Sequence, residues 1–182
     1  LGTERNFREV HKGQVYNVTE VRYALFPTRA GRLRIEPAEL SFPEDLFDRF
    51  FNSRQQSAGP KVLRTRPVEV DVRELPAPKP AGFSGIVASR CELQGTIGRT
   101  SVPRGEAVEL KFTLETDGFL KGYAGLELAE PEGTRLHDAA ENVASAPRDE
   151  RLVGRLTAEK VLVTTREGTV HVPAVEVTWF DV

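Results

Sequence analysis

Cysteine is nearly absent from this chain of 182 residues, which contains only Cys91. A single cysteine cannot form an intramolecular disulfide, so no disulfide framework holds the fold together. We interpret Cys91 as a small, half-buried residue of a strand. A nucleophilic thiol would need a neighbouring base, and the sequence offers none at this position.

Long apolar runs and basic runs are missing as well. The longest apolar run extends only from Tyr23 to Phe26, whereas a helix that spans a bilayer needs about 20 apolar residues. We therefore expect no transmembrane segment in this stretch of protein. Lysine and arginine total 25 against 27 acidic residues, a formal net charge of −2, which argues against nucleic acid as a partner.

Residues that carry chemistry are few and scattered. The three histidines, His11, His137 and His171, lie far apart and none has metal-ligand spacing. Ser84 lies between Gly82 and Gly85, but Gly85 stands one position too early for the G-x-S-x-G nucleophile elbow of a hydrolase. Five acidic residues could gather around a cation but lack the spacing of a calcium loop, so we interpret them as a solvated face; they are Glu127, Glu130, Glu132, Asp138 and Glu141. No catalytic residue, cofactor or metal ligand is predicted.

What the chain does contain is one stretch in two copies, residues 24–35 and 161–172. Thr28, Arg29 and Gly31 of the first copy correspond to Thr165, Arg166 and Gly168 of the second. Each copy is an apolar run, a polar turn with a glycine where a positive φ is needed, and an alternating run. This pattern predicts a β-hairpin in each copy and two similar β units in tandem.

Residues 43–55 give the one predicted helix, an insertion in the first unit. Ser41 and Glu44 have capping-box spacing, and Pro43 suits a first helical turn. The apolar face of this helix consists of Leu46, Phe47, Phe50 and Phe51. Periodicity does not tell whether this face plugs the core of the first unit or contacts a partner. We expect Phe50 in the core, where Phe50→Ala would cost roughly 3–5 kcal/mol.

The rest of the sequence predicts short strands. Two of them lie between residues 7 and 26 with a turn at Lys12-Gly13, and another runs from Arg32 past Pro37, which marks an edge or a bulge. Further strands are predicted at 62–75, 90–96, 108–114, 123–128 and 152–163, with Val175, Val177 and Trp179 on one face of a last one. Residues 130–150 are weakly patterned and are expected to be loops with at most one short strand.

These elements predict an all-β chain built from tandem immunoglobulin-like β-sandwich units. Residues 1–75 would be the C-terminal part of a first domain, 76–82 a proline-rich linker, and 83–182 a second domain. Both units are expected to be truncated, because the second has about 75 residues before its copy of the repeat and the first only 23. The first unit, in turn, has a strand after its copy that the second lacks.

Taken together, several motifs resemble the BatD family of bacterial oxygen-tolerance, or aerotolerance, proteins. They are Tyr23–Gly31 with Ile35–Ala38, the junction Gly82–Gly85, Thr100–Val102 before Gly105-Glu106, and Val172–Ala174 with Trp179–Asp181. The motifs occur in the family's order over nearly the whole chain. The chain departs from the family in the aromatic helix at 43–55 and at Asp117-Gly118, where the family tends to have Gly-Asn.

The resemblance implies an exported protein on the periplasmic side of the bacterial inner membrane, anchored by a C-terminal helix outside this segment. It implies von Willebrand A-domain membrane proteins as partners and supplies no catalytic residues. We therefore expect a non-enzymatic protein-interaction module in an oxygen-tolerance or envelope-stress assembly. The alternative is a ligand-binding module for glycan or peptidoglycan, since β-sandwiches carry many carbohydrate sites.

Overall fold

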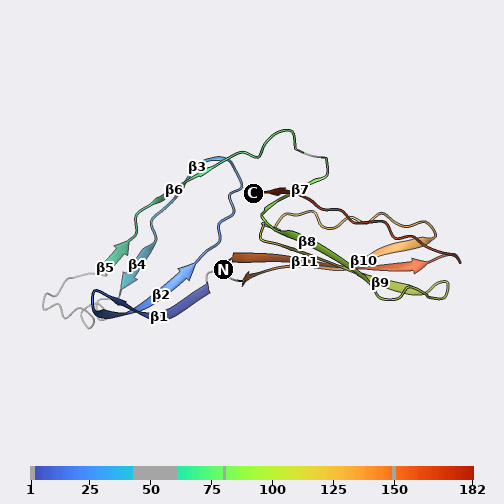
Figure 1. Cartoon of the computed structure of the whole chain (residues 1–182), viewed down its shortest axis with the longest axis horizontal. Coiled ribbons are helices and arrows are strands. Elements are labelled where there is room, and N and C mark those ends of the chain that lie inside the picture. Colours follow the sequence, from blue (N-terminus) through green and yellow to red (C-terminus); the bar gives the residue numbers. More distant parts are fainter. Residues whose placement is uncertain (1–2, 43–60, 80, 149–150) are drawn as a thin grey trace. The chain divides into compact units, whose positions relative to one another are not determined.

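The structure is a computed structural model that describes residues 3–42, 61–79, 81–148 and 151–182. In these ranges the chain forms strands, turns and irregular segments but no helix, so the predicted all-β class is confirmed for them (Figure 1). No helix in this part of the chain is long and apolar enough to cross a membrane. The predicted helix at 43–55, with Leu46, Phe47, Phe50 and Phe51, lies outside the described residues.

The chain divides into two compact units. The first combines residues 1–26 with residues 78–182, and the second consists of residues 27–77. The chain therefore passes between the units twice, at Phe26-Pro27 and at Ala77-Pro78.

The larger part of the first unit is built from two small sheets. An antiparallel sheet of four strands has the order β10-β11-β9-β8, and a parallel pair joins β12 to β7. The strands are β7 (Phe83–Ala88), β8 (Cys91–Ile97), β9 (Ala107–Thr116), β10 (Thr134–Arg148), β11 (Arg151–Thr164) and β12 (Thr178–Asp181). The Ser84 hydroxyl donates a 2.5 Å hydrogen bond to the Thr178 carbonyl, so the residue that resembled a nucleophile ties β7 to β12.

The hydrophobic core of the first unit lies on the inner face of the four-stranded sheet. Along β9, every second residue from Val108 to Thr116 is buried, as alternation predicts. Leu114 and Leu156 lie opposite each other on β9 and β11 and are completely buried. Ile86 of β7 joins the same cluster, so the core connects the two sheets.

The N-terminal residues of the first unit form a hairpin of β1 (Thr3–His11) and β2 (Gln14–Arg22). Lys12 and Gly13 make the turn with φ values of 50° and 81°, the left-handed conformations that a two-residue hairpin turn needs. The predicted turn is thus confirmed, although the second strand ends at Arg22 and does not reach Phe26.

The second unit is a single long ribbon of two antiparallel chain segments. Its strands are β3 (Gly31–Ile35), β4 (Glu39–Phe42), β5 (Lys61–Arg64) and β6 (Val68–Val72). β3 pairs with β6 and β4 pairs with β5, and the same register continues from one pair to the next. Between the pairs, where Pro37 and Pro67 lack an N–H donor, Thr65 N–H still donates to the Ala38 carbonyl at 3.0 Å.

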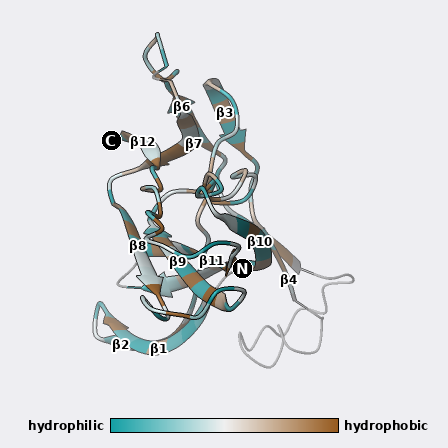
Figure 2. Cartoon of the chain, turned by 90° about the vertical axis from the view of Figure 1, so that its right-hand side faces the viewer, coloured by the Kyte–Doolittle hydropathy of each residue, from teal (hydrophilic) through white to brown (hydrophobic). Residues whose placement is uncertain are grey.

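The ribbon of β3 and β6 has one charged and one apolar face. Arg32 pairs with Asp71 at 3.2 Å on the charged face. The apolar residues alternate with the charged ones along each strand, a pattern that Figure 2 shows along β3. They are Leu33, Ile35, Val68, Val70 and Val72, of which Leu33 and Val72 are partly buried and the other three are exposed.

The structure corrects both predicted hairpins of the repeat. Gly31 and Gly168 do have positive φ values, 114° and 126°. The runs beside them nevertheless do not pair with each other, because β3 pairs with the distant β6, and β11 lies between β9 and β10. Cross-strand side-chain pairs with a distant strand stabilise the sheet more than the local turn does, so the distant strand becomes the partner.

Two predicted strands and one predicted loop region differ as well. The expected strand at 62–75 is two strands with a break at 65–67, and its valines at 68 and 70 are exposed, not half-buried. Residues 123–128 form no strand, whereas 134–148, expected to be mostly loop, form the long strand β10. β10 escaped prediction because, beyond Leu136, its residues are all exposed, so no alternation marks it.

Candidate functional site

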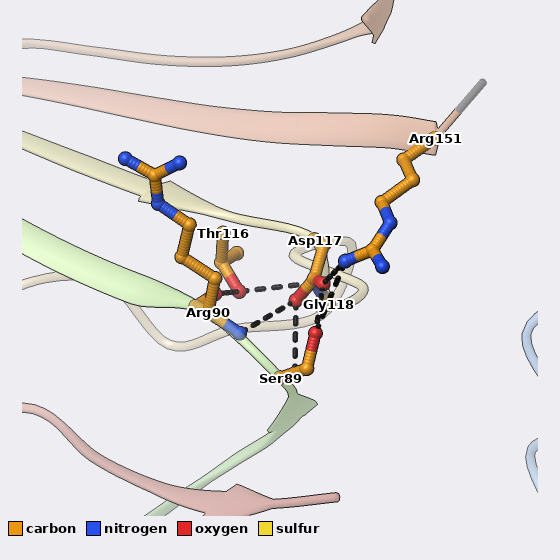
Figure 3. Close-up of polar contacts among 6 residues, drawn as sticks. All are labelled: Ser89, Arg90, Thr116, Asp117, Gly118 and Arg151. Carbon is orange, nitrogen blue, oxygen red and sulfur yellow. Dashed lines mark hydrogen bonds and ion pairs between the residues drawn. The ribbon is translucent and has the colours of Figure 1, made fainter. Parts of the chain in front are cut away.

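The densest group of polar contacts in the first unit surrounds Asp117, directly after β9 (Figure 3). One carboxylate oxygen, Oδ1, accepts the backbone N–H groups of Ser89 at 3.0 Å and Arg90 at 2.9 Å. The other, Oδ2, accepts the Ser89 hydroxyl at 2.5 Å and a guanidinium N–H of Arg151 at 3.3 Å. The Asp117 side chain therefore fixes the turn between β7 and β8 to the end of β9 and to the start of β11.

Thr116 and Gly118 complete this arrangement, which we call the Asp117 clamp. The buried Thr116 hydroxyl donates to the Arg90 carbonyl at 2.8 Å and accepts the Gly118 N–H at 3.0 Å. Arg90 takes part through its backbone, and its guanidinium points away from the cluster (Figure 3). A Cβ on Gly118 would lie 2.6 Å from the Val87 carbonyl oxygen, so this position has no room for a side chain.

The electrostatics of the clamp favour an ionised carboxylate. Burial raises the pKa of Asp117, but hydrogen bonds from the Ser89 hydroxyl and from the backbone N–H groups of Arg90 and Ser89 lower it more. The resulting pKa lies below the ordinary value of 3.8. A carboxylate with a lowered pKa is a poor base, so the Ser89–Asp117 pair is not suited to activate a serine nucleophile. Its hydrogen bonds serve the fold.

A second feature of the first unit is a polar groove of about 720 Å³. We call the segment Ala124–Ala129 the wall of the groove and the lining residues of β10 and β11 its floor. The lining residues of the floor are Leu136, Asp138, Ala139, Ala140, Glu141, Ala158, Glu159 and Lys160. This volume is within the range of small-molecule sites.

Lys160 is the unusual residue of this groove. It stands on β11 in the row of Leu156, Ala158 and Leu162, which are all buried, and only 9% of its own surface is exposed. Its ammonium group donates to Asp138 Oδ1 at 2.5 Å. The Asp138 side chain is 84% exposed, so the ion pair joins the interior to the groove.

Two further carboxylates of the groove, those of Glu127 and Glu141, lie near the phenol of Tyr123. Burial, and then the charges of Cys91, Glu141 and Glu127, raise the pKa of Tyr123 above its ordinary value. Glu141 also lies over Gly125, where an added Cβ would be 2.9 Å from the carboxylate. The sequence suggested these acidic residues only as a solvated face.

The other acidic residues of that set have structural partners. Glu130 accepts the Leu136 N–H at 3.0 Å, and Glu132 pairs with Arg166 at 2.8 Å. Among the described residues, no group of three or more potential ligands is arranged to hold a metal ion. His11, His137 and His171 are all exposed. Cys91 is half-buried, as predicted, and burial raises the pKa of its thiol, which disfavours the reactive thiolate.

Sequence reasoning found neither the clamp nor the groove. Asp117-Gly118 was readable as a turn, but its partners Ser89 and Arg151 lie 28 and 34 positions away in the chain. Lys160 was visible as a break in the apolar alternation of 152–163. Three of the acidic residues that the sequence suggested as a group, Glu127, Asp138 and Glu141, do line the groove. The apolar face of the predicted helix, for which the sequence left core packing and partner contact open, is outside the described residues; it consists of Leu46, Phe47, Phe50 and Phe51. No family model, curated protein or solved structure matches this chain.

Proposed function

We propose that this chain is a non-enzymatic protein-interaction module of a BatD-like protein on the periplasmic side of the bacterial inner membrane. It would act in an oxygen-tolerance or envelope-stress assembly, with von Willebrand A-domain membrane proteins as its partners. In this proposal residues 1–75 and 83–182 belong to two immunoglobulin-like β-sandwich domains in tandem, and the anchoring helix belongs to a part of the protein beyond this segment.

Two features support this proposal. The BatD-like motifs follow the family's order through both units, from Tyr23–Gly31 to Trp179–Asp181. The most concentrated polar cluster of the first unit, the Asp117 clamp, uses its hydrogen bonds on backbone and turn groups. Such a cluster fits a scaffold that presents surfaces to other proteins better than it fits a catalytic site.

The observation that carries the proposal is the exposed apolar face of the β3–β6 ribbon. In the second unit Ile35, Val68 and Val70 expose 38–54% of their surfaces, and all three lie on one face. Contiguous apolar surface of this kind is typical of protein-interaction sites. The opposite face is covered by ion pairs of Arg32 with Glu69 and Asp71.

Crosslinking in native membranes tests the proposal. The protein is tagged, crosslinked in place and captured, and the bound proteins are identified by mass spectrometry. We expect von Willebrand A-domain membrane proteins in the captured set. A Val68→Ser/Val70→Ser variant should capture less of them, because both changes remove apolar surface from the proposed face.

A matched control is Val10→Ser/Val15→Ser, which changes an exposed, directly paired couple of valines on the β1–β2 hairpin. This control should leave capture unchanged, and melting curves of both variants exclude unfolding as the cause. If no such partner is captured while peptidoglycan fragments raise the melting temperature, the chain is the ligand-binding module of the alternative.

A further inference from the structure

The polar groove holds a lysine where the fold favours an apolar residue. The neighbours of Lys160 in its row of β11, Ala158 and Leu162, are each 3% exposed. A buried ammonium is costly unless it is paired, and an apolar residue of similar size is often neutral or better for stability. Packing alone therefore does not account for Lys160. Its ammonium, held by Asp138, brings a fixed ion pair to the floor of the groove.

The wall of the groove offers backbone groups for pairing. Residues 124–129 belong to no strand, and their N–H and C=O groups make no hydrogen bond to the backbone of another described residue. Free backbone donors and acceptors beside a groove can pair with an added strand. Two contacts join this segment to β10: Gly125 lies beside Glu141, and Glu130 accepts the Leu136 N–H.

The side chains that line the groove determine which charge a ligand should carry. Glu127, Asp138 and Glu141 bring three carboxylates against the one ammonium of Lys160, a formal balance of −2. Glu159 also lines the groove, and Lys111 pairs with it at 2.9 Å. Alanines make up much of the remaining lining and leave room for side chains of a ligand; they are Ala124, Ala129, Ala139, Ala140 and Ala158.

We propose that the polar groove binds a short extended segment of a partner protein that carries lysine or arginine side chains. The segment pairs its backbone with residues 124–129 and places basic side chains against Glu127, Glu141 and Asp138. The acidic balance steers such a segment to the groove and rejects acidic ones. This inference rests on the proposed interaction function and names the chemistry of one partner segment.

Titration of the 182-residue chain with two synthetic peptides tests the inference. One peptide alternates valine and lysine over five residues, and the other replaces each lysine with glutamate. Backbone amide NMR spectra report which residues respond. We expect the lysine peptide to shift the amides of residues 124–129 and 136–141, more weakly as salt is raised. The glutamate peptide should shift none of them.

Paired variants sharpen the test. Glu127→Gln/Glu141→Gln should weaken binding of the lysine peptide roughly fivefold or more, since each exposed ion pair contributes modestly. Glu92→Gln/Glu176→Gln makes the same change in net charge at two exposed positions outside the groove and should leave the affinity unchanged.

Any of three results would overturn the inference. The two peptides could bind equally well, the shifts could be confined to residues outside the groove, or a peptidoglycan fragment could bind in the groove where the lysine peptide does not. If the peptide titration fails but von Willebrand A-domain proteins are captured, the proposed interaction function remains and only the groove is excluded as a binding site. If the titration and the capture both fail, the interaction function and the groove site are both excluded.

Discussion

Lys160 and Asp138 lie opposite each other on β11 and β10, and their side chains form an ion pair of 2.5 Å between a nearly buried ammonium and an exposed carboxylate. The pair is unequal. Lys160 depends on Asp138 because little solvent reaches it, whereas water can hydrate Asp138 without Lys160. The pair also lies directly before the irregularity in the ladder between Asp138 and Ala140.

This asymmetry predicts unequal costs of mutation. Asp138→Ala should destabilise the fold by roughly 1–2 kcal/mol, because it leaves the buried ammonium without its partner. Lys160→Met should be neutral or stabilising, since it removes the buried charge. Urea unfolding of the two single variants and the double variant measures the coupling. A larger loss from Lys160→Met than from Asp138→Ala would contradict this account.

Gly118 is expected to tolerate no side chain. In Gly118→Ala the Cβ would lie 2.6 Å from the Val87 carbonyl oxygen and 3.0 Å from the Ile86 side chain, so the turn after β9 must shift. We expect a clear drop in melting temperature. Gly98→Ala is the control, because there the Cβ would meet its nearest neighbour at an ordinary 3.6 Å. Equal melting temperatures of the two variants would show that the Gly118 contact is not limiting.

The clamp predicts a loss of stability in Asp117→Asn. The amide keeps one acceptor oxygen but loses the charge-assisted hydrogen bonds from Ser89 and Arg151. We expect the free energy of unfolding to fall by roughly 1–3 kcal/mol. Asp71→Asn, at a carboxylate that is 78% exposed, should cost far less. Chemical denaturation of both variants provides the comparison, and a similar effect of the two would argue against a structural role for the clamp.

The same carboxylate predicts a pH dependence. Because the pKa of Asp117 is lowered in the folded state, its contribution to stability is present above the ordinary value of 3.8. The contribution is lost as pH falls below that value and through the lowered pKa. The free energy of unfolding should therefore differ between wild type and Asp117→Asn at pH 7, and the difference should shrink in this acid range. A constant difference down to pH 2–3 would contradict the lowered pKa.

Packing predicts a strong contrast between two leucines. Leu114 is completely buried in the first unit, so Leu114→Ala should cost roughly 2–5 kcal/mol through lost burial and the cavity that remains. Leu40 of the second unit is 56% exposed, and Leu40→Ala should cost much less. Thermal unfolding measures both changes. A large effect at Leu40 would mean that this residue packs against something in solution.

Local sequence signals determined the elements that depend only on neighbouring residues. Strict alternation from Val108 to Leu114 predicted β9 and its buried row, and Lys12-Gly13 predicted the turn of the first hairpin. Pro37 predicted an irregularity in the strand after Arg32, and there the structure divides the strand into β3 and β4. Each of these signals is a property of the residues themselves. It is the period of two in β9, the left-handed φ in the hairpin turn and the missing N–H at Pro37.

Tertiary structure alone decided which segments pair and which polar groups meet. The repeat around Gly31 and Gly168 resembles a hairpin locally, yet β3 pairs with β6 because a distant strand supplies the better ladder. β10 shows no alternation and becomes a strand only because β11 offers it a partner. Asp117 meets Ser89 of the turn between β7 and β8, and Lys160 meets Asp138 across the sheet. Such contacts depend on strand order and register, which chain neighbours do not encode.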